Sequence, residues 1–520
     1  MTLYKLRMNM KTLKSLTLWG LASSVLAVAG VVCAADIRVG YTLDALTLDP
    51  GNHRKRETET ILRNMYDGLL TRDSKMKAVS ELAASWKQID VTTYEFKLRP
   101  GVKFHSGDEM TSEDVKFTLD RMIQKNGIDG QTSPRGGLLG PLKEVQAVDK
   151  YTVRLVLSTP WAILPAMLPF QEIVSKAFVQ KVGDKGLATQ VNGTGPFKLV
   201  EWRKGDAIIM ERFADYYGGS PAIPPVGPAK ADRVIFKVIP ENSSRVAALL
   251  AGDVEIAAEL PVHMMKQVES GKNTKVVKVN GTRSFFVSLN NTKPPFNNPL
   301  VRRAANHALD KKLIIDRILQ KTATPINGVL SPDTFGFDAT LPAYEYDVAK
   351  AKKLLAEAGF PNGIDVTLDV EGAFAEMAQA IGSLLTKAGI RTKVVVGEGS
   401  VLKAKWDPKK PKVGDMWLTS WGNGSLDPED IFAPTLATGD RGNSAGYSSA
   451  IVDGLLSAAS TETNPAKRAE MFGRAQKQVN ADAPWVFLWV PQDIYGVSKR
   501  LKGWQPSADS RINLHRAYIE

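Results

Sequence analysis

Cysteine and histidine are scarce in this sequence. One cysteine, Cys33, is present among 520 residues, together with five histidines. The histidines lie far apart, at His53, His105, His263, His307 and His515. No two of them form an HxxxH or HExxH pair, so the sequence predicts no metal site. A single cysteine excludes an internal disulfide, so the fold must rest on its hydrophobic cores. We also expect no cofactor.

Long apolar runs are also lacking, with one exception at the N-terminus. Residues 16–32 are apolar or small, and the basic residues before them are Lys5, Arg7, Lys11 and Lys14. Small residues at 33–35 then offer a cleavage site. This order predicts a cleaved secretory signal peptide over residues 1–35. An uncleaved membrane anchor is the weaker alternative, because the run is near the lower length limit for a span. The sequence leaves open whether translation begins at Met8 or Met10.

Charge of one sign is nowhere concentrated in a long block. The net charge is +12, from 67 lysines and arginines against 55 aspartates and glutamates. Basic residues are spread along the chain with acids between them, which is typical of a solvated surface and argues against a nucleic-acid-binding stripe. A chain of 520 residues exceeds what one hydrophobic core holds, so we expect two or three lobes.

A strongly patterned stretch runs from Glu81 to Met122. Residues 93–98 alternate between apolar and polar, as in a half-buried strand. Residues 111–114 combine a hydroxyl cap with acids in a first turn and predict the start of a helix. Its apolar face consists of Val115, Leu119 and Met122. The stretch therefore predicts strand, turn, strand, turn and helix.

The same kind of pattern predicts elements elsewhere in the chain. Residues 57–70 look helical, and Gly205-Asp206 predicts a hairpin between two strands. Residues 363–396 read as strand, helix and strand, which is typical of an α/β lobe. Residues 485–491 form an apolar strand.

The residues of the patterned stretch resemble a family signature. LAASW followed by YEFKLRPGVKFHSGDEMTSEDVKFTLDR is similar to the signature of the family 5 extracellular solute-binding proteins, the dipeptide- and oligopeptide-binding receptors of bacterial ABC importers. NGTGPF and PPFNNPLVRRAANHALD also match segments of that family. The resemblance covers the mature chain from end to end. It implies an α/β fold like that of type II periplasmic binding proteins, with two lobes, a hinge and an extra subdomain in the first lobe.

The resemblance also implies how the chain is divided and what it does. Lobe I would span residues 36–282, with an inserted subdomain at about 57–192. Lobe II would span 283–484, and residues 485–520 would return to lobe I. The expected protein is a monomeric periplasmic substrate-binding protein that captures a peptide or peptide-like solute between its lobes. It would deliver that solute to an inner-membrane ABC permease with its ATPase subunits, without catalysing a reaction.

The residues predicted to contact the ligand are Tyr41, Asp44, Arg283, Trp417, Trp421, Asn423 and Asp427. Tyr41 and Asp44 follow the first strand, which in the family ends at the ligand cleft. Arg283 lies at the presumed lobe crossing and could meet a ligand carboxylate. In the peptide-binding members, an acid three residues after a tryptophan pairs with the α-ammonium group of the ligand. Gly424 occupies that position here, and Asp427 could either replace the acid or cap the next turn.

Two alternatives remain open at this stage. Residues 442–446 fit the pattern G-x-S-x-G, which would make Ser444 the nucleophile of a secreted serine hydrolase. No apolar strand precedes the serine, so chance explains this pattern better. The second alternative keeps the receptor fold and replaces the peptide by an opine or an oligosaccharide.

Overall fold

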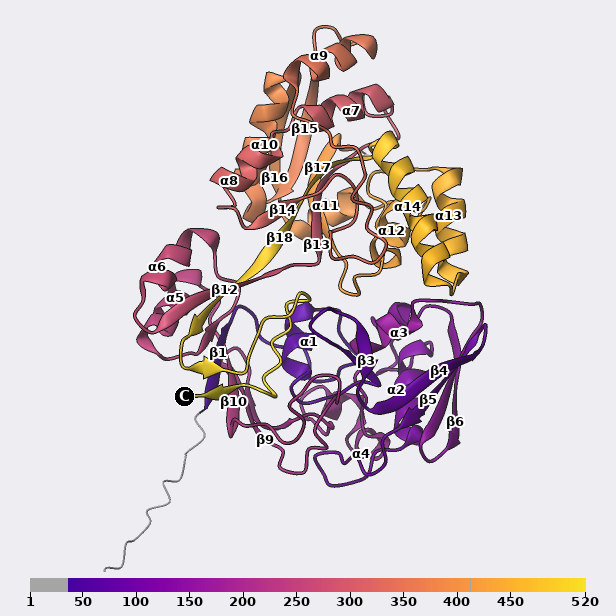
Figure 1. Cartoon of the computed structure of the whole chain (residues 1–520), viewed down its shortest axis with the longest axis vertical. Coiled ribbons are helices and arrows are strands. Elements are labelled where there is room, and N and C mark those ends of the chain that lie inside the picture. Colours follow the sequence, from indigo (N-terminus) through magenta and orange to yellow (C-terminus); the bar gives the residue numbers. More distant parts are fainter. Residues whose placement is uncertain (1–35, 412) are drawn as a thin grey trace, which may run out of the picture. The chain divides into compact units, whose positions relative to one another are not determined.

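The computed structural model describes residues 36–411 and 413–520. The predicted signal peptide and Cys33 lie outside the described residues. The chain crosses twice between two groups of strands (Figure 1). We call residues 36–280 and 492–520 lobe I, and residues 283–491 lobe II.

Lobe I is built on a sheet whose strands are largely buried. Strand β1 (Ile37–Tyr41) pairs in parallel with β10 (Arg233–Val238) and β11 (Ile256–Ala257). The sheet continues through β9 (Ala207–Arg212) to β8 (Phe197–Arg203), and these two form the predicted hairpin around Gly205-Asp206. The other strands and helices of this part are α4 (Lys176–Leu187), α5 (Asn242–Ala251), α6 (Met265–Ser270), β12 (Thr274–Asn280), β19 (Leu501–Lys502) and β20 (Tyr518–Ile519).

The patterned stretch folds into a subdomain of lobe I. Its sheet has the order β4 (Ala83–Asp90), β5 (Thr93–Leu98), β7 (Thr152–Leu157) and β6 (Leu142–Asp149). Helix α2 (Ser112–Ile123) is capped by Thr111, which forms a capping box with Asp114. Val115, Leu119 and Met122 are fully buried, as the apolar face predicts. The subdomain also holds β2 (Leu70–Arg72), β3 (Ala78–Ser80) and α3 (Leu164–Met167).

The helix expected over residues 57–70 is shorter than predicted. Helix α1 spans Arg56–Leu62, and the prediction is wrong for the remainder of the segment. The backbone beyond it bonds to a distant loop: Gly195 N–H donates to Met65 O over 3.0 Å and Phe197 N–H donates to Asn64 O over 3.1 Å. A helical pattern in sequence does not reveal such long-range partners, which here end the helix.

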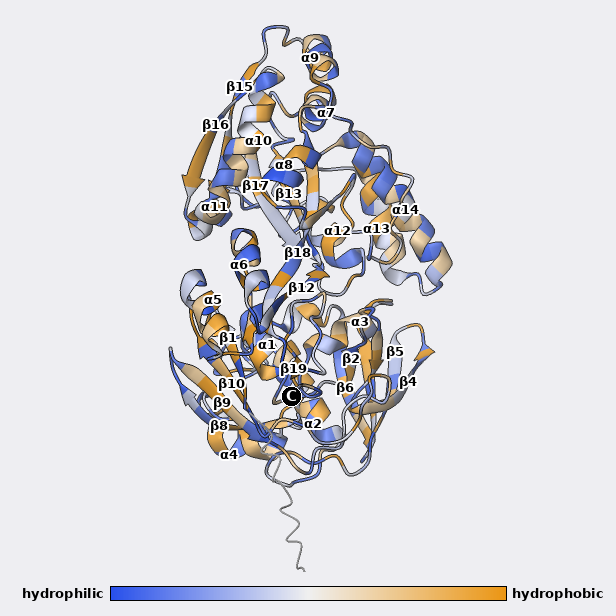
Figure 2. Cartoon of the chain, turned by 60° about the vertical axis from the view of Figure 1, so that its left-hand side comes forward, coloured by the Kyte–Doolittle hydropathy of each residue, from blue (hydrophilic) through white to orange (hydrophobic). Residues whose placement is uncertain are grey.

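Lobe II is the α/β unit that the alternation predicted. Strands β15 (Ile364–Glu371) and β16 (Ile390–Gly397) are parallel, and α10 (Ala375–Lys387) connects them. Strand β17 (Met416–Gly422) lies between β15 and β13 (Arg283–Leu289). The remaining elements of this lobe are α7 (Pro299–His307), α8 (Lys311–Arg317), β14 (Ala323–Pro325), α9 (Val348–Glu357), α11 (Gly399–Lys405), α12 (Glu429–Leu436), α13 (Ala450–Thr461) and α14 (Pro465–Asp482). Helices of this lobe carry both hydrophilic and hydrophobic residues in Figure 2, as expected for helices with one buried face.

One long strand, β18 (Trp485–Ser498), belongs to both lobes. Its residues up to Pro491 pair with β13 and β14 of lobe II, and its residues from Gln492 pair with β12 of lobe I. Beside it, the chain passes from β12 to β13 through Gly281 and Thr282. Two adjacent crossing segments are the arrangement that a hinge between two lobes requires.

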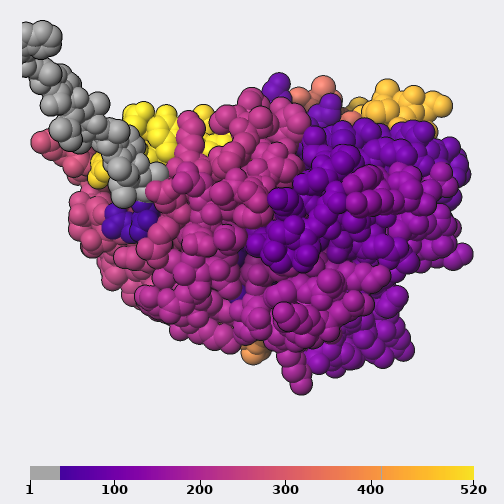
Figure 3. All heavy atoms as spheres, turned by 90° about the horizontal axis from the view of Figure 1, so that it is seen from below, coloured from indigo at the N-terminus to yellow at the C-terminus, as the bar shows by residue number. Residues whose placement is uncertain are grey.

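The C-terminal residues pack against lobe I. In the space-filling view of Figure 3, yellow C-terminal atoms lie beside the magenta atoms of lobe I. Leu514 N–H donates to Asn64 Oδ1 over 2.9 Å, and Asn64 Nδ2 donates to Ile512 O over 3.0 Å. Residues 492–520 therefore complete the first lobe.

Candidate functional site

A cavity of about 380 Å³ lies between residues of the two lobes. Its lobe I lining consists of Arg54, Lys55, Arg56, Glu57, Glu59, Arg135, Leu138, Phe170, Asp509 and Arg511. Its lobe II lining consists of Arg283, Trp421, Gly422, Gly424, Asp430 and Arg441. The lobes also touch directly, because Trp161 Nε1 donates to Glu429 Oε1 over 2.8 Å. A second cavity, of about 210 Å³, shares Arg56, Glu57 and Arg283 with the first.

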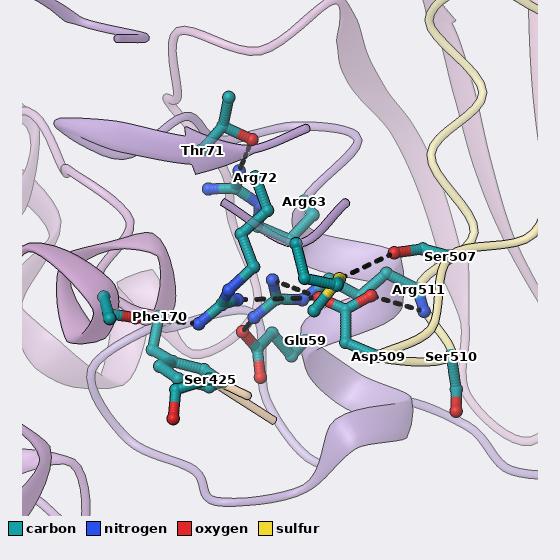
Figure 4. Close-up of polar contacts among 12 residues, drawn as sticks. Glu59, Arg63, Thr71, Arg72, Phe170, Ser425, Ser507, Asp509, Ser510 and Arg511 are labelled. Atoms are coloured by element: carbon teal, nitrogen blue, oxygen red, sulfur yellow. Dashed lines mark hydrogen bonds and ion pairs between the residues drawn. The ribbon is translucent and has the colours of Figure 1, made fainter. Parts of the chain in front are cut away.

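A buried network of ion pairs forms the lobe I side of the cavity (Figure 4). Arg511 pairs with Glu59 and, at 2.7 Å, with Asp509. Arg72 lies 3.5 Å from Asp509, and Arg135 lies 3.5 Å from Glu59. Burial alone would raise the pKa of Glu59, but Arg511 and Arg135 lower it to about 2. Each of these three arginines is paired with a carboxylate, and the network stabilises the lobe I side of the cavity. We call this network of Glu59, Arg72, Arg135, Asp509 and Arg511 the floor.

The ring of Phe170 lies between two arginines of lobe I and Gly424 of lobe II. The guanidinium carbon of Arg72 lies 4.2 Å from the ring centroid, and that of Arg511 lies 5.1 Å from it. A Cβ placed on Gly424 would lie 3.1 Å from the ring of Phe170. The aromatic ring therefore fills the space that an acidic side chain at position 424 would need.

Arg56 and Arg283 approach each other across the cavity from different lobes. A Cβ placed on Gly422 would lie 3.3 Å from Nη2 of Arg283 and 3.5 Å from Nη2 of Arg56, so the two nitrogens are no farther apart than the sum of these distances. Arg56 donates to Ser510 Oγ over 2.6 Å, and Arg283 donates to Ser420 Oγ over 3.2 Å. Surrounding protein and the charge of Arg56 together lower the pKa of Arg283 to about 10.

Arg54 and Arg441 also line the cavity, from opposite lobes. Arg54 donates to Pro134 O over 3.2 Å, and the guanidinium carbon of Arg441 stands 5.0 Å from the centroid of a Trp421 ring. Burial lowers the pKa of Arg54, and the positive charges of Arg441 and Arg135 lower it further.

Two of the lining acids are not part of the floor network. Asp430 is bonded to Ser425, whose Oγ donates over 3.1 Å, and burial raises the pKa of this carboxyl group. Glu57, in the first turn of α1, has no ion pair within the described residues. Glu57 is therefore the carboxylate best placed to meet a positive group of a ligand.

Three of the predicted contact residues lie at these cavities. Arg283 lines both of them, Trp421 lines the larger one and Tyr41 lines the smaller one. Gly424, identified in the sequence as the departure from the family pattern, also lines the larger cavity. That these side chains contact a ligand stays a prediction.

Asp427 does not line the cavity within the described residues and has another partner. Its carboxylate accepts two hydrogen bonds from Arg468, over 2.6 and 2.8 Å, and Oδ1 also accepts from Glu429 N–H over 3.0 Å. The bond from Glu429 N–H is the turn cap that the sequence offered as an alternative. The structure thus gives Asp427 a role inside lobe II.

The other predicted contact residues are also bonded elsewhere. Asp44 accepts hydrogen bonds from Trp202 Nε1 and from Gly205 N–H, over 2.9 and 2.7 Å. Trp417 is buried and stacks on Trp406, with ring centroids 5.8 Å apart. Asn423 is buried behind the cavity wall, where its N–H donates to the Thr282 carbonyl over 2.8 Å. None of these three lines the described cavities.

Ser444 is bonded inside lobe II. Its hydroxyl lies 2.8 Å from the hydroxyl of Ser288 on β13, and the residue is 5% exposed. The G-x-S-x-G pattern here is part of a loop between α12 and α13. A buried hydroxyl bonded to a second hydroxyl has no base to activate it.

Sequence reasoning missed most of the charged lining. Arg54, Arg56 and Glu57 form one run with Lys55, but Arg135, Arg441 and Arg511 lie far from it in sequence. The basic run at 54–56 was the available signal. Pairing it with arginines of the other lobe requires the fold.

Comparison with known proteins supplies the family. The family model for bacterial extracellular solute-binding proteins, family 5 (middle region), matches residues 77–443. The glutathione-binding protein GsiB of Pectobacterium atrosepticum is 30% identical over 516 residues, which cover 96% of this chain and 98% of that relative.

Solved structures agree with this similarity. The periplasmic binding protein DppA of Helicobacter pylori, in complex with the peptide STSA, is 29% identical with a TM-score of 0.79, covering 94% of this chain and 98% of that one. AgaA from A. tumefacien R10, in complex with agropinic acid, is 26% identical with a TM-score of 0.76, covering 94% and 99%. Both similarities extend over lobe I and lobe II together.

Proposed function

The chain belongs to the bacterial extracellular solute-binding proteins of family 5, and we propose that it captures a small peptide-like solute in the cavity between its lobes. It is a substrate-binding protein of an ABC importer for peptides or related solutes, and it is not an enzyme. A ligand that contacts both lobes stabilises the closed arrangement, because it makes all its contacts only there. The permease then recognises this closed form.

The observation that carries this proposal is the cavity itself. Side chains from α1, from the start of β13 and from the end of β17 converge on it, although α1 lies more than 200 residues before the two strands in sequence. Polar and aromatic groups line a concave space of about 380 Å³, within the usual size range of small-molecule sites.

A glutathione-like tripeptide is the ligand class that we place first. The relative with 30% identity is a glutathione-binding protein, and the lining combines free arginines with one free glutamate. Glutathione carries two carboxylates and one ammonium group, which suit those residues. An opine is the second candidate, since it is also anionic and a relative is known with agropinic acid bound.

The localisation proposed is the periplasm. The relative DppA of Helicobacter pylori is a periplasmic binding protein, and the N-terminal pattern predicts a cleaved signal peptide. The described residues contain no helix long and apolar enough to cross a membrane. N-terminal sequencing of the exported protein should return Ala35 or Asp36, and Met1 on a membrane-bound product would contradict the proposal.

Calorimetry with the purified protein tests the ligand class. The panel consists of glutathione, the peptide Ser-Thr-Ser-Ala, an opine and a neutral trisaccharide. Saturable 1:1 binding of glutathione or the peptide supports the proposal. Binding of the trisaccharide alone would contradict it, and binding of the opine alone would replace the ligand class within the same site.

A further inference from the structure

We propose that two pairs of arginines, Arg56 with Arg283 and Arg54 with Arg441, bind two anionic groups of one ligand and so make closure of the lobes depend on an anion. Each pair takes one arginine from lobe I and one from lobe II. The inference rests on the proposed function and specifies the charge of the solute and the residues that select it.

The first step is the balance of charge at the cavity. Seven basic and four acidic residues line it. Two of the acids, Glu59 and Asp509, are already paired with arginines of the floor. Among the described residues no ion pair neutralises any of the four arginines named above. The site therefore holds an excess of positive charge where the ligand is expected.

The second step is the geometry of Arg56 and Arg283. Nη2 of Arg56 and Nη2 of Arg283 both lie within 3.5 Å of one point beside Gly422. An oxygen atom placed between two guanidinium groups at such a spacing can accept a charge-assisted hydrogen bond from each. Each arginine also has one donor bonded to a serine of its own lobe, which orients its planar fork. The absence of a side chain at Gly422 leaves this position open.

The third step concerns the positive end of the ligand. In this chain Gly424 and the ring of Phe170 occupy the place of the acid that the family pattern puts near the α-ammonium group. Glu57 lies beside Arg56 and lines both cavities. The arrangement favours a ligand with two anionic groups and at most one positive group, so its net charge is negative.

Repulsion within the pairs links binding to closure. Closing the lobes brings like charges together inside a partly enclosed space, which is unfavourable unless a counter-charge is present. An anionic group between the two arginines converts that repulsion into attraction on both sides. A neutral solute of the same size gives no such compensation and leaves the open arrangement favoured.

Calorimetry tests the charge selectivity with three tripeptides of equal length: glutathione, Ala-Ala-Ala and Ala-Lys-Ala. We expect wild-type protein to bind glutathione at least about tenfold more tightly than Ala-Ala-Ala, because charge-assisted bonds are the strong ones. R56Q and R283Q should each remove most of that preference. The control variants R203Q and R391Q replace exposed arginines that pair with Glu201 and Asp365, and should leave the preference unchanged.

The outcomes separate this inference from the proposed function. Ala-Ala-Ala binding as tightly as glutathione, or a preference that survives in R56Q and R283Q, overturns the arginine pairs and leaves the peptide-binding function standing. Failure of all three tripeptides to bind contradicts the proposed ligand class. In that case the ligand-free protein decides: at low salt the double variant R56Q/R283Q should have a smaller scattering radius than wild type, and equal radii overturn the inference.

Discussion

Individual side chains at the interlobe cavity divide into those held by partners within the protein and those left with free charge. Arg135 and Arg511 belong to the first group, since buried carboxylates accompany them. Arg56 and Arg283 belong to the second, and within the described residues their guanidinium groups donate to the hydroxyl groups of Ser510 and Ser420. Chemistry read from a residue type alone does not distinguish the groups, because the partner decides the role.

Asp427→Asn tests the structural role of a predicted contact residue. The substitution leaves buried Arg468 with Glu429 as its remaining acid, at 3.1 Å. We expect the free energy of unfolding to fall by about 3 kcal/mol, the lower end of the cost of breaking a buried pair. Asp365→Asn, in an exposed pair with Arg391, should change the free energy of unfolding much less. Urea denaturation measures both, and weaker ligand binding by Asp427→Asn without lost stability would contradict the assignment.

Gly424→Asp tests whether the family's acid can be restored by one substitution. The Cβ alone would lie 3.1 Å from the Phe170 ring, so the ring must move. We expect a loss of about 1–3 kcal/mol in stability, as for overpacked sites. The variant should gain no affinity for peptides with a free ammonium group, as calorimetry can show. The double variant Gly424→Asp/Phe170→Ala removes the Phe170 ring that obstructs the new side chain. If Gly424→Asp alone were stable and bound such peptides tightly, the steric role of Phe170 would be wrong.

At the scale of the element, the short connections between strands position the charged residues. Helix α1 starts at Arg56, the last residue of the basic run, and β13 starts at Arg283, immediately after the crossing. Strand β17 ends at Gly422, opposite Arg283 in the ladder. Three element ends therefore meet at one place, which is why residues distant in sequence form one site.

Gly281→Ala tests the crossing segment. A Cβ there would lie 2.7 Å from Pro491 O, which also accepts a hydrogen bond from Gly281 N–H over 3.1 Å. The two crossing segments would have to separate, and we expect a loss of about 1–3 kcal/mol in unfolding free energy together with weaker ligand binding. Gly454→Ala is the control, because this helical glycine has nothing within 4 Å and alanine favours helices. The account would be wrong if both variants behaved alike in thermal denaturation and calorimetry.

The turn that contains His105 predicts a pH dependence. His105 Nε2 lies 3.1 Å from Gly195 O, and Gly193 N–H donates to Nδ1 over 3.3 Å, so the neutral ring fits its surroundings. Burial lowers the pKa of His105 from 6.5 to about 4. Protonation is then easier in the unfolded chain, so stability is full above pH 6.5 and falls as the pH drops toward 4.

The size of this effect can be measured in a variant. For His105 the pKa difference corresponds to about 3 kcal/mol of unfolding free energy. His105→Gln should remove that part of the decline in unfolding free energy between pH 6.5 and 4. Urea denaturation at several pH values measures this decline. An unchanged decline in His105→Gln would show that other groups cause it.

On the scale of the whole molecule, the sequence predicted the architecture better than the site. The structure contains the elements that three local patterns predicted: those of the stretch from Glu81 to Met122, the hairpin at Gly205-Asp206 and the strand–helix–strand unit at 363–396. These predictions succeeded because periodicity and turn residues act locally. Helix α1 was predicted too long, because a distant loop supplies the bonds that end it. The arginine pairs escaped prediction, because each joins residues that only the folded lobes bring together.

We expect one small anionic solute to occupy the cavity between the lobes. Native mass spectrometry of the protein as purified from the periplasm tests it most directly, with the released molecule identified by fragmentation. The account predicts one bound molecule per wild-type chain, carrying at least two carboxyl groups, and its depletion from R56Q/R283Q. A bound molecule that is neutral or cationic, or one that the double variant retains in full, would contradict the claim.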